Sequence, residues 1–151
     1  MREWQKRWNN AVKGRWTRTL IPNLEPWVER KHGATDFHLT YTLSGHGCFA
    51  EFLHRIRKAN SPECWFCDAE LDDADHTLFH CERWDQERWQ LMRETTEWPT
   101  RDNFVNILLR TKEDWEAASK YVRVILKAKE EFKRERDKLN GNEDGDVQHM
   151  A

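Results

Sequence analysis

The hydrophobic and polar positions of this chain follow a helical period in most segments. In residues 3–13, Trp4 and Trp8 lie four apart with Arg, Lys and Gln between them, and Gly14 ends the pattern. We expect this segment to be an amphipathic helix whose tryptophans face a core. The same period predicts further helices, separated by an extended link over 17–22 and by turns, over residues 25–33, 37–43, 49–56, 84–98, 104–109 and 112–139.

The last of these predicted helices is the longest. Trp115, Ala118 and Ile125 mark its apolar face, and Phe132 continues that face. From Lys127 onward nearly every residue is charged, so we expect the helix to project into solvent or to meet a partner. The pattern as a whole predicts an all-α fold, a small multi-helix domain with a long C-terminal helix.

A cluster of cysteine and histidine residues changes this picture. Cys64, Cys67, His76 and Cys81 lie within eighteen residues in the order C-x2-C-x8-H-x4-C. Three thiolates and one imidazole are ligands that suit tetrahedral Zn²⁺, and four protein ligands leave no open position for a reactive water. A disulfide interpretation would leave the histidine unexplained. The spacing therefore predicts a structural zinc knuckle that braces the helices.

His80 is an alternative to His76 as the fourth ligand, because it is adjacent to Cys81. Neighbouring residues point in divergent directions, so His80 and Cys81 can bind one metal only with strain. His76 is the preferred ligand for that reason. The surrounding loop is acidic, which would repel phosphate and favours a bracing role for the knuckle itself; the acidic residues are Glu63, Asp68, Glu70, Asp72, Asp73 and Asp75.

Composition limits the class of protein. Charged residues make up 34% of the 151 positions, yet nine Trp, seven Phe and two Tyr supply the apolar area that disordered chains lack. No segment approaches the roughly 20 apolar residues of a membrane span, and Met1 is not followed by a signal-like apolar run. We expect a soluble, unsecreted protein without a membrane partner. Free thiol ligands favour a reducing compartment, either nuclear or cytoplasmic.

Charge is distributed unevenly. Residues 1–60 carry eleven Lys and Arg against five Asp and Glu, whereas residues 61–100 carry three against eleven. A basic first part with interleaved tryptophans can attract polyanions such as RNA or DNA. The candidate contacts are Arg7, Lys13, Arg15 and Arg18. A solvated helix face with inward tryptophans explains the same pattern, and both interpretations stay open.

The turn Ser44-Gly45-His46-Gly47-Cys48 sets a hydroxyl, an imidazole and a thiol side by side. Catalytic pairs need convergence in space and an orienting third group, which sequence neighbours do not provide. A glycine-flanked turn between two helices is the favoured interpretation, and no catalytic residue is assigned. The chain then divides into a basic helical part over 1–60, the zinc knuckle over 61–82, C-terminal helices over 83–139 and a disordered tail over 140–151.

These motifs together resemble the C-terminal region of insect non-LTR retrotransposon polyproteins, of the type that targets rDNA or telomeres. The resemblance spans about residues 4–125 and depends on the glycine turn and the knuckle occurring together. It includes Lys13 to Thr17, Leu20 to Pro22, Trp27, Arg30 to Gly33, Phe37 to Phe49, Cys64, Cys67, Asp72 to Cys81 and Arg83-Trp84. Tyr41 departs from the family, which usually has Gln there.

The resemblance implies that Cys64, Cys67, His76 and Cys81 are metal ligands. It also implies a parent polyprotein that is an RNA-directed DNA polymerase with an endonuclease. This chain has no room for either enzyme domain, so we expect the tail piece of such a polyprotein or a host gene derived from it. Its expected role is non-catalytic, with element RNA or target DNA as partners in target-primed reverse transcription. The alternative is a protein-interaction or assembly module that uses the aromatic and long-helix surfaces; the oligomeric state stays open.

Overall fold

The computed structural model describes the backbone of residues 2–150 and the side chains of residues 2–141, and within this part every regular element is helical. The all-α prediction is confirmed. None of the described helices combines the length and the apolar character that a membrane-spanning segment needs. The elements are α1 (Arg2–Asn10), α2 (Arg15–Leu20), α3 (Leu24–Val28), α4 (Phe37–Ser44), α5 (Ala50–Arg55), the π-helix η1 (His76–His80), the 3-10 turn η2 (Glu82–Trp84), α6 (Asp85–Thr95), α7 (Phe104–Arg110) and α8 (Lys112–Met150).

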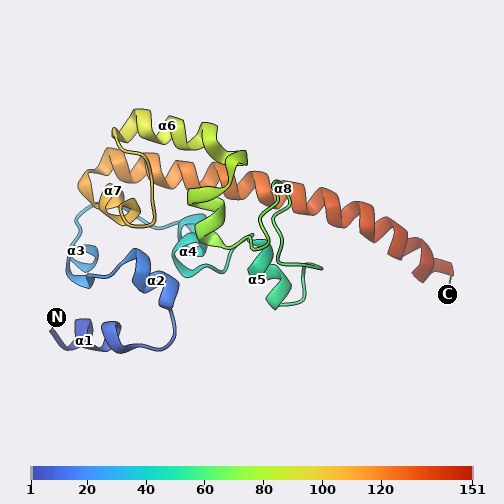
Figure 1. Ribbon diagram of the computed structural model, residues 1–151, viewed down its shortest axis with the longest axis horizontal. Helices are drawn as coiled ribbons and strands as arrows, with labels where there is room; N and C mark the ends of the chain where they lie inside the picture. Colours follow the sequence, from blue (N-terminus) through green and yellow to red (C-terminus); the bar gives the residue numbers. More distant parts are fainter. Residues whose placement is uncertain (1, 151) are drawn as a thin grey trace.

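Helix α8 forms the axis of the molecule. Helices α4, α6 and α7 pack along its first half, and its second half extends past the body (Figure 1). The predicted apolar face is buried as expected, at Trp115, Ala118 and Ile125, while Phe132 lies at the surface. The disorder predicted for 140–151 falls almost wholly on residues whose side chains lie outside the described part, so it stays a prediction.

Helix α2 replaces the extended link expected over 17–22. Leu20 and Ile21 are buried, the Trp16 indole N–H donates to the Thr42 carbonyl at 2.8 Å, and the Thr17 hydroxyl donates to the Leu43 carbonyl at 2.7 Å. These contacts need a helical turn that places Trp16 and Leu20 on one side. The expectation of an extended segment was wrong, because packing against α4 outweighs the preference of the threonines for an extended backbone.

The tryptophan stripe of α1 is only partly a core feature. No residue of α1 is buried, and Trp4 is 67% exposed. Trp8 is half-buried, and its indole N–H donates to the Ile21 carbonyl at 2.7 Å. The expectation that both tryptophans face a core was wrong for Trp4, because α1 lies at the edge of the molecule where only one of them meets other elements (Figure 1).

Helix α4 and the turn that follows it have the predicted form. Asp36 accepts a hydrogen bond from the Leu39 amide at 2.8 Å and so caps the first turn, and Gly45 ends the helix in the left-handed conformation, with φ of 74°. The His46 ring stacks on Phe52 with 4.8 Å between ring centroids. Cys48 is half-buried, and burial raises the pKa of its thiol to about 11.

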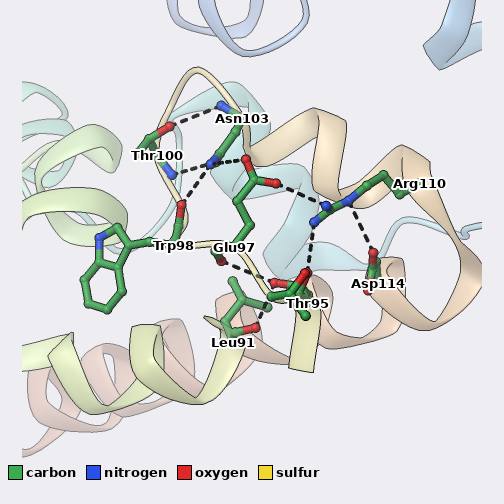
Figure 2. Close-up of polar contacts among 9 residues, drawn as sticks. Leu91, Thr95, Glu97, Trp98, Thr100, Asn103, Arg110 and Asp114 are labelled. Carbon is green, nitrogen blue, oxygen red and sulfur yellow. Dashed lines mark hydrogen bonds and ion pairs between the residues drawn. The ribbon is translucent and has the colours of Figure 1, made fainter. Parts of the chain in front are cut away.

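The connection between α6 and α7 is held by side-chain hydrogen bonds and ion pairs. Asn103 donates to the Glu97 carboxylate at 3.1 Å and to the Trp98 carbonyl at 2.8 Å (Figure 2). Arg110 of α7 pairs with Glu97 at 3.1 Å and with Asp114 of α8 at 3.3 Å. The loop therefore fixes α6, α7 and the start of α8 relative to one another, and these helices form the platform behind the cysteine cluster.

Candidate metal centre

The structure brings Cys64, Cys67, His76 and Cys81 into one group. Their ligand atoms all lie within 4.8 Å of one another. The sulfurs of Cys64 and Cys81 are 3.8 Å apart, those of Cys67 and Cys81 are 4.0 Å apart, and the Cys67 sulfur is 3.3 Å from His76 Nε2. Cys48, the remaining cysteine, lies outside this group.

These separations fit a tetrahedral metal site. With Zn–S bonds of about 2.3 Å, tetrahedral geometry places two sulfurs roughly 3.8 Å apart. With a Zn–N bond of about 2.05 Å, a sulfur and the nitrogen lie roughly 3.6 Å apart. The three distances given above, 3.8, 4.0 and 3.3 Å, agree with these values within a few tenths of an ångström, while the widest separation in the group is up to 4.8 Å. Three soft sulfurs with one imidazole are a donor set typical of zinc. The four side chains can therefore hold a metal ion, and the geometry is compatible with zinc.

His80 does not join the group. Its side chain is 62% exposed, and Nε2 lies 3.4 Å from Asp75 Oδ1. His76 instead begins η1, where its amide donates to Asp73 Oδ1 at 2.8 Å. The π-helical turn η1 brings the Cys81 amide within 2.7 Å of the His76 carbonyl, so these two residues lie next to each other, while the exposed His80 side chain faces outward.

Burial tunes the protonation of the group. Desolvation raises the pKa of Cys64, and it raises the pKa of Cys81 to about 12. It lowers the pKa of His76, which keeps that imidazole neutral and available as a ligand. Without a metal the buried cysteines thus stay neutral thiols near pH 7, and metal binding has to displace their protons.

Two buried side chains from the C-terminal helices hold the backbone around the last two ligands. The guanidinium of Arg88, on α6, donates to the Cys81 carbonyl, with Nη1 at 2.9 Å, and Arg88 is 1% exposed. The phenol of Tyr121, on α8, donates to the Leu78 carbonyl inside η1, and its burial raises the pKa of that phenol. These contacts bind the ligand-bearing segment directly to the helix platform.

A buried ion pair joins α8 to the loop that carries the ligands. Lys129 Nζ lies 2.6 Å from Asp72 Oδ2 and 2.7 Å from Thr77 Oγ1, and neither charged side chain is more than 1% exposed. Asp72 also accepts a hydrogen bond from the Ala50 amide at 3.1 Å, at the first residue of α5. One carboxylate therefore ties α5, η1 and α8 together.

Sequence reasoning missed Lys129 and Arg88. Lys129 stands among the charges after Lys127, which indicated a solvated face. A signal was nevertheless present, because Lys129 is four residues after Ile125 and therefore continues the buried stripe. Asp72 was counted as one more acid of a hydrophilic loop, and only the tertiary contact reveals its partner.

The acidic charge of the knuckle is partly neutralised by residues far away in the sequence. Asp72 pairs with Lys129, and Asp75 lies 3.7 Å from Arg101. The acidic side chains of residues 61–82 that stay exposed are Glu63, Asp68, Glu70 and Glu82. The excess of acids counted locally over residues 61–100 thus overstates the repulsion that a polyanion meets at this surface.

The four candidate nucleic-acid contacts differ in their exposure to solvent. Arg7, Lys13 and Arg15 are exposed. Arg18 is partly buried, and its Nη1 donates to the Asn9 carbonyl at 3.1 Å, so it connects α2 to the end of α1. The basic first part therefore presents three of its four candidate cations to solvent, and the fourth has a structural contact.

The helices and the cysteine cluster together define an all-α module with a candidate structural metal site. A Retrovirus-related Pol polyprotein from type-1 retrotransposable element R1 of Bradysia coprophila is 38% identical to it over 78 residues, which are 52% of this chain and 8% of that protein. Pol polyproteins from elements R1 4 and R1 2 of Nasonia vitripennis are 33% and 29% identical over 79 and 85 residues, or 52% and 56% of this chain.

The resemblance to retrotransposon polyproteins is therefore confirmed over about half of the chain. The chain spans only 8% to 20% of the length of these relatives, so the similarity is to one part of such a polyprotein. No family model matches the chain, and no solved structure matches it.

Proposed function

We propose that the chain is a non-catalytic, zinc-braced C-terminal module of a non-LTR retrotransposon reverse transcriptase. In this role it helps the polyprotein bind element RNA or target DNA during target-primed reverse transcription in the nucleus. The observation that supports this proposal most strongly is the close Cys-Cys-His-Cys group in a chain similar to R1 Pol polyproteins. Zinc with four protein ligands contributes stability and no reactive water, so the module acts through the surfaces it holds in place.

The zinc part of the proposal is tested with two matched histidine variants. His76→Asn removes a proposed ligand, whereas His80→Asn removes an exposed imidazole outside the group. Elemental analysis of the purified chain is expected to give about one zinc per chain for the unaltered protein and for His80→Asn. His76→Asn is expected to lose most of it. Equal zinc content in both variants contradicts the assignment of His76.

The nucleic-acid part is tested by binding measurements at different salt concentrations. Phosphate contacts release counterions, so affinity for RNA or DNA has to fall as salt rises above about 50 mM. Reversing the charge of Arg7, Lys13 and Arg15 together is expected to weaken binding if the basic first part is the contact surface. Absence of binding to both RNA and DNA contradicts this part of the proposal.

A protein-interaction or assembly module, from an element or from a host gene derived from one, is the second candidate. The face between α6 and α8 supports it, since an apolar hollow there is bordered by Leu91, Tyr121 and Val124, and Val124 is 43% exposed. Light scattering over a range of concentrations tests one form of this candidate, self-assembly. A Val124→Glu variant that changes neither mass nor nucleic-acid binding argues against this use of the face.

A further inference from the structure

A polar cleft lies between the loop before the cysteines and the second half of α8. It encloses about 540 Å³. Lys58 and Trp65 lie on its loop side, and Lys133 and Arg136, one helical turn apart, lie on its α8 side. Cations from segments far apart in the sequence thus converge on one concave surface beside the metal centre.

A second hollow adjoins this cleft, because Lys58 and Lys133 line both. It encloses about 460 Å³ and lies between the glycine turn, α5 and α8. The exposed His46 ring, stacked on Phe52, forms part of its wall, and Arg134 adds a cation. Lys58 and Lys133 therefore form a cationic ridge with a flat aromatic surface on each side.

Most of the acidic side chains that line these hollows already pair with a neighbouring side chain. Asp137 forms an ion pair with Lys133, and Glu130 accepts from His38 Nε2 at 2.6 Å. Within residues 2–141, Glu63 is the acid of the first cleft that forms no ion pair. Lys58 and Arg136 are both exposed and outnumber this single acid. The ridge and its surroundings therefore carry a net positive charge, which suits a chain of phosphates.

The aromatic surface of the first cleft is preorganised. The Trp65 ring stacks on Phe132 with 5.8 Å between centroids and an angle of 23°, and Arg136 lies 5.9 Å from the same ring. The backbone at Lys58 is also set in place, because Arg57 adopts the left-handed conformation with φ of 65° and the Lys58 amide donates to the Leu53 carbonyl at 2.6 Å. A flat ring beside cations is the arrangement with which proteins hold single-stranded nucleic acid.

We propose that the two hollows form one binding track for single-stranded nucleic acid. Lys58 and Arg136 hold backbone phosphate, while Trp65 on one side and the His46–Phe52 stack on the other accept bases. This inference rests on the proposed function and places its contact surface beside the knuckle, away from the basic first part. It also gives the metal a role in recognition, since Cys64 fixes the loop that carries Trp65.

The test uses the full chain loaded with zinc and fluorescein-labelled single-stranded RNA and DNA of roughly 12 nucleotides in anisotropy titrations. The variant Lys58→Glu/Arg136→Glu is compared with Lys120→Glu/Lys127→Glu, which makes the same charge change at exposed positions outside both hollows. We expect the first to bind at least about tenfold more weakly, with a salt slope reduced by about 1.4, and the second to stay within about twofold of the parent. Circular dichroism and zinc content check that both variants are folded.

Trp65 provides an independent readout of base stacking. Trp65→Phe keeps an aromatic face and is expected to retain most binding, whereas Trp65→Leu is expected to lose about fivefold or more. The inference is overturned if the Lys58/Arg136 variant binds like the parent. If Arg7→Glu/Arg15→Glu weakens binding instead, the proposed function stands with a different contact surface. If the parent chain binds neither RNA nor DNA, the proposed function and this inference both fail.

Discussion

The basic N-terminal part and the acidic knuckle use their charged residues in opposite ways. In α1 and α2, Arg7 and Arg15 point to solvent, and α1 has no buried residue. In the knuckle, Asp72 is buried against Lys129 of α8. Charge counted along the sequence therefore indicated two surfaces of opposite sign, whereas the folded chain keeps the basic one and uses part of the acidic one internally. The difference shows that charge counted along the sequence predicts the charge of the folded surface only where no residue distant in the sequence pairs with the charged side chains.

The largest expected effect concerns the metal centre. Cys67→Ser removes a proposed ligand, and metal binding at such sites contributes about 10–16 kcal/mol of apparent free energy that becomes folding free energy. We expect this variant to lose its zinc and to unfold around the knuckle, while the N-terminal helices, which hold no ligand, change less. Zinc content and far-UV circular dichroism measure this. Cys48→Ser, outside the group, is the control; equal losses in both variants contradict the assignment.

The next largest effect concerns the buried ion pair. Lys129→Met leaves the Asp72 carboxylate buried without its partner, which costs about 3–5 kcal/mol, whereas Lys127→Met at an exposed position changes stability by less than about 0.5 kcal/mol. Urea unfolding of the two variants gives both values. The double variant Asp72→Asn/Lys129→Met is expected to recover part of the loss. Similar midpoints for the two single variants show that the pair does not bind α8 to the knuckle.

A smaller effect is expected from pH, which changes the metal affinity of the knuckle and leaves the N-terminal part, which holds no ligand, unaffected. Burial raises the pKa of Cys64 and Cys81, so both are protonated near pH 7 without metal and ionised with it. Release of these two protons alone makes metal affinity rise by at least about 100-fold for each pH unit, so affinity falls as the solution is acidified. Competition with a chelator at pH 6 to 8 measures the slope. A slope near zero excludes neutral thiols as the metal-free form.

The smallest expected effects lie in α1. Trp4→Ala removes an exposed ring, and stability is expected to change by less than about 0.5 kcal/mol. Trp8→Ala removes the hydrogen bond to Ile21 and a partly buried ring, and a loss of about 1–2 kcal/mol is expected. Thermal unfolding compares the two variants. A large loss in Trp4→Ala contradicts the assignment of α1 as the weakly attached edge.

Helical periodicity predicted most of the fold because it records which faces are buried. The stripe of Trp115, Ala118 and Ile125 on α8 was readable in this way, as was the glycine turn after α4. Helix α2 and the exposure of Trp4 were not, since both depend on which element lies alongside. In the candidate site, spacing identified the cysteines and His76, while Lys129 and Arg88 carry no pattern beyond their positions on buried helix faces.

The sequence by itself determined the all-α class and the four side chains able to hold a metal, because helical period and donor spacing are local properties of the chain. It also carried the likeness to R1 Pol polyproteins. Only the tertiary structure decided that His80 faces away from the group, that Lys129 and Arg88 anchor it, and that Lys58, Trp65 and Lys133 meet beside it. The physical reason is that burial and ion pairing between distant segments arise only when helices pack.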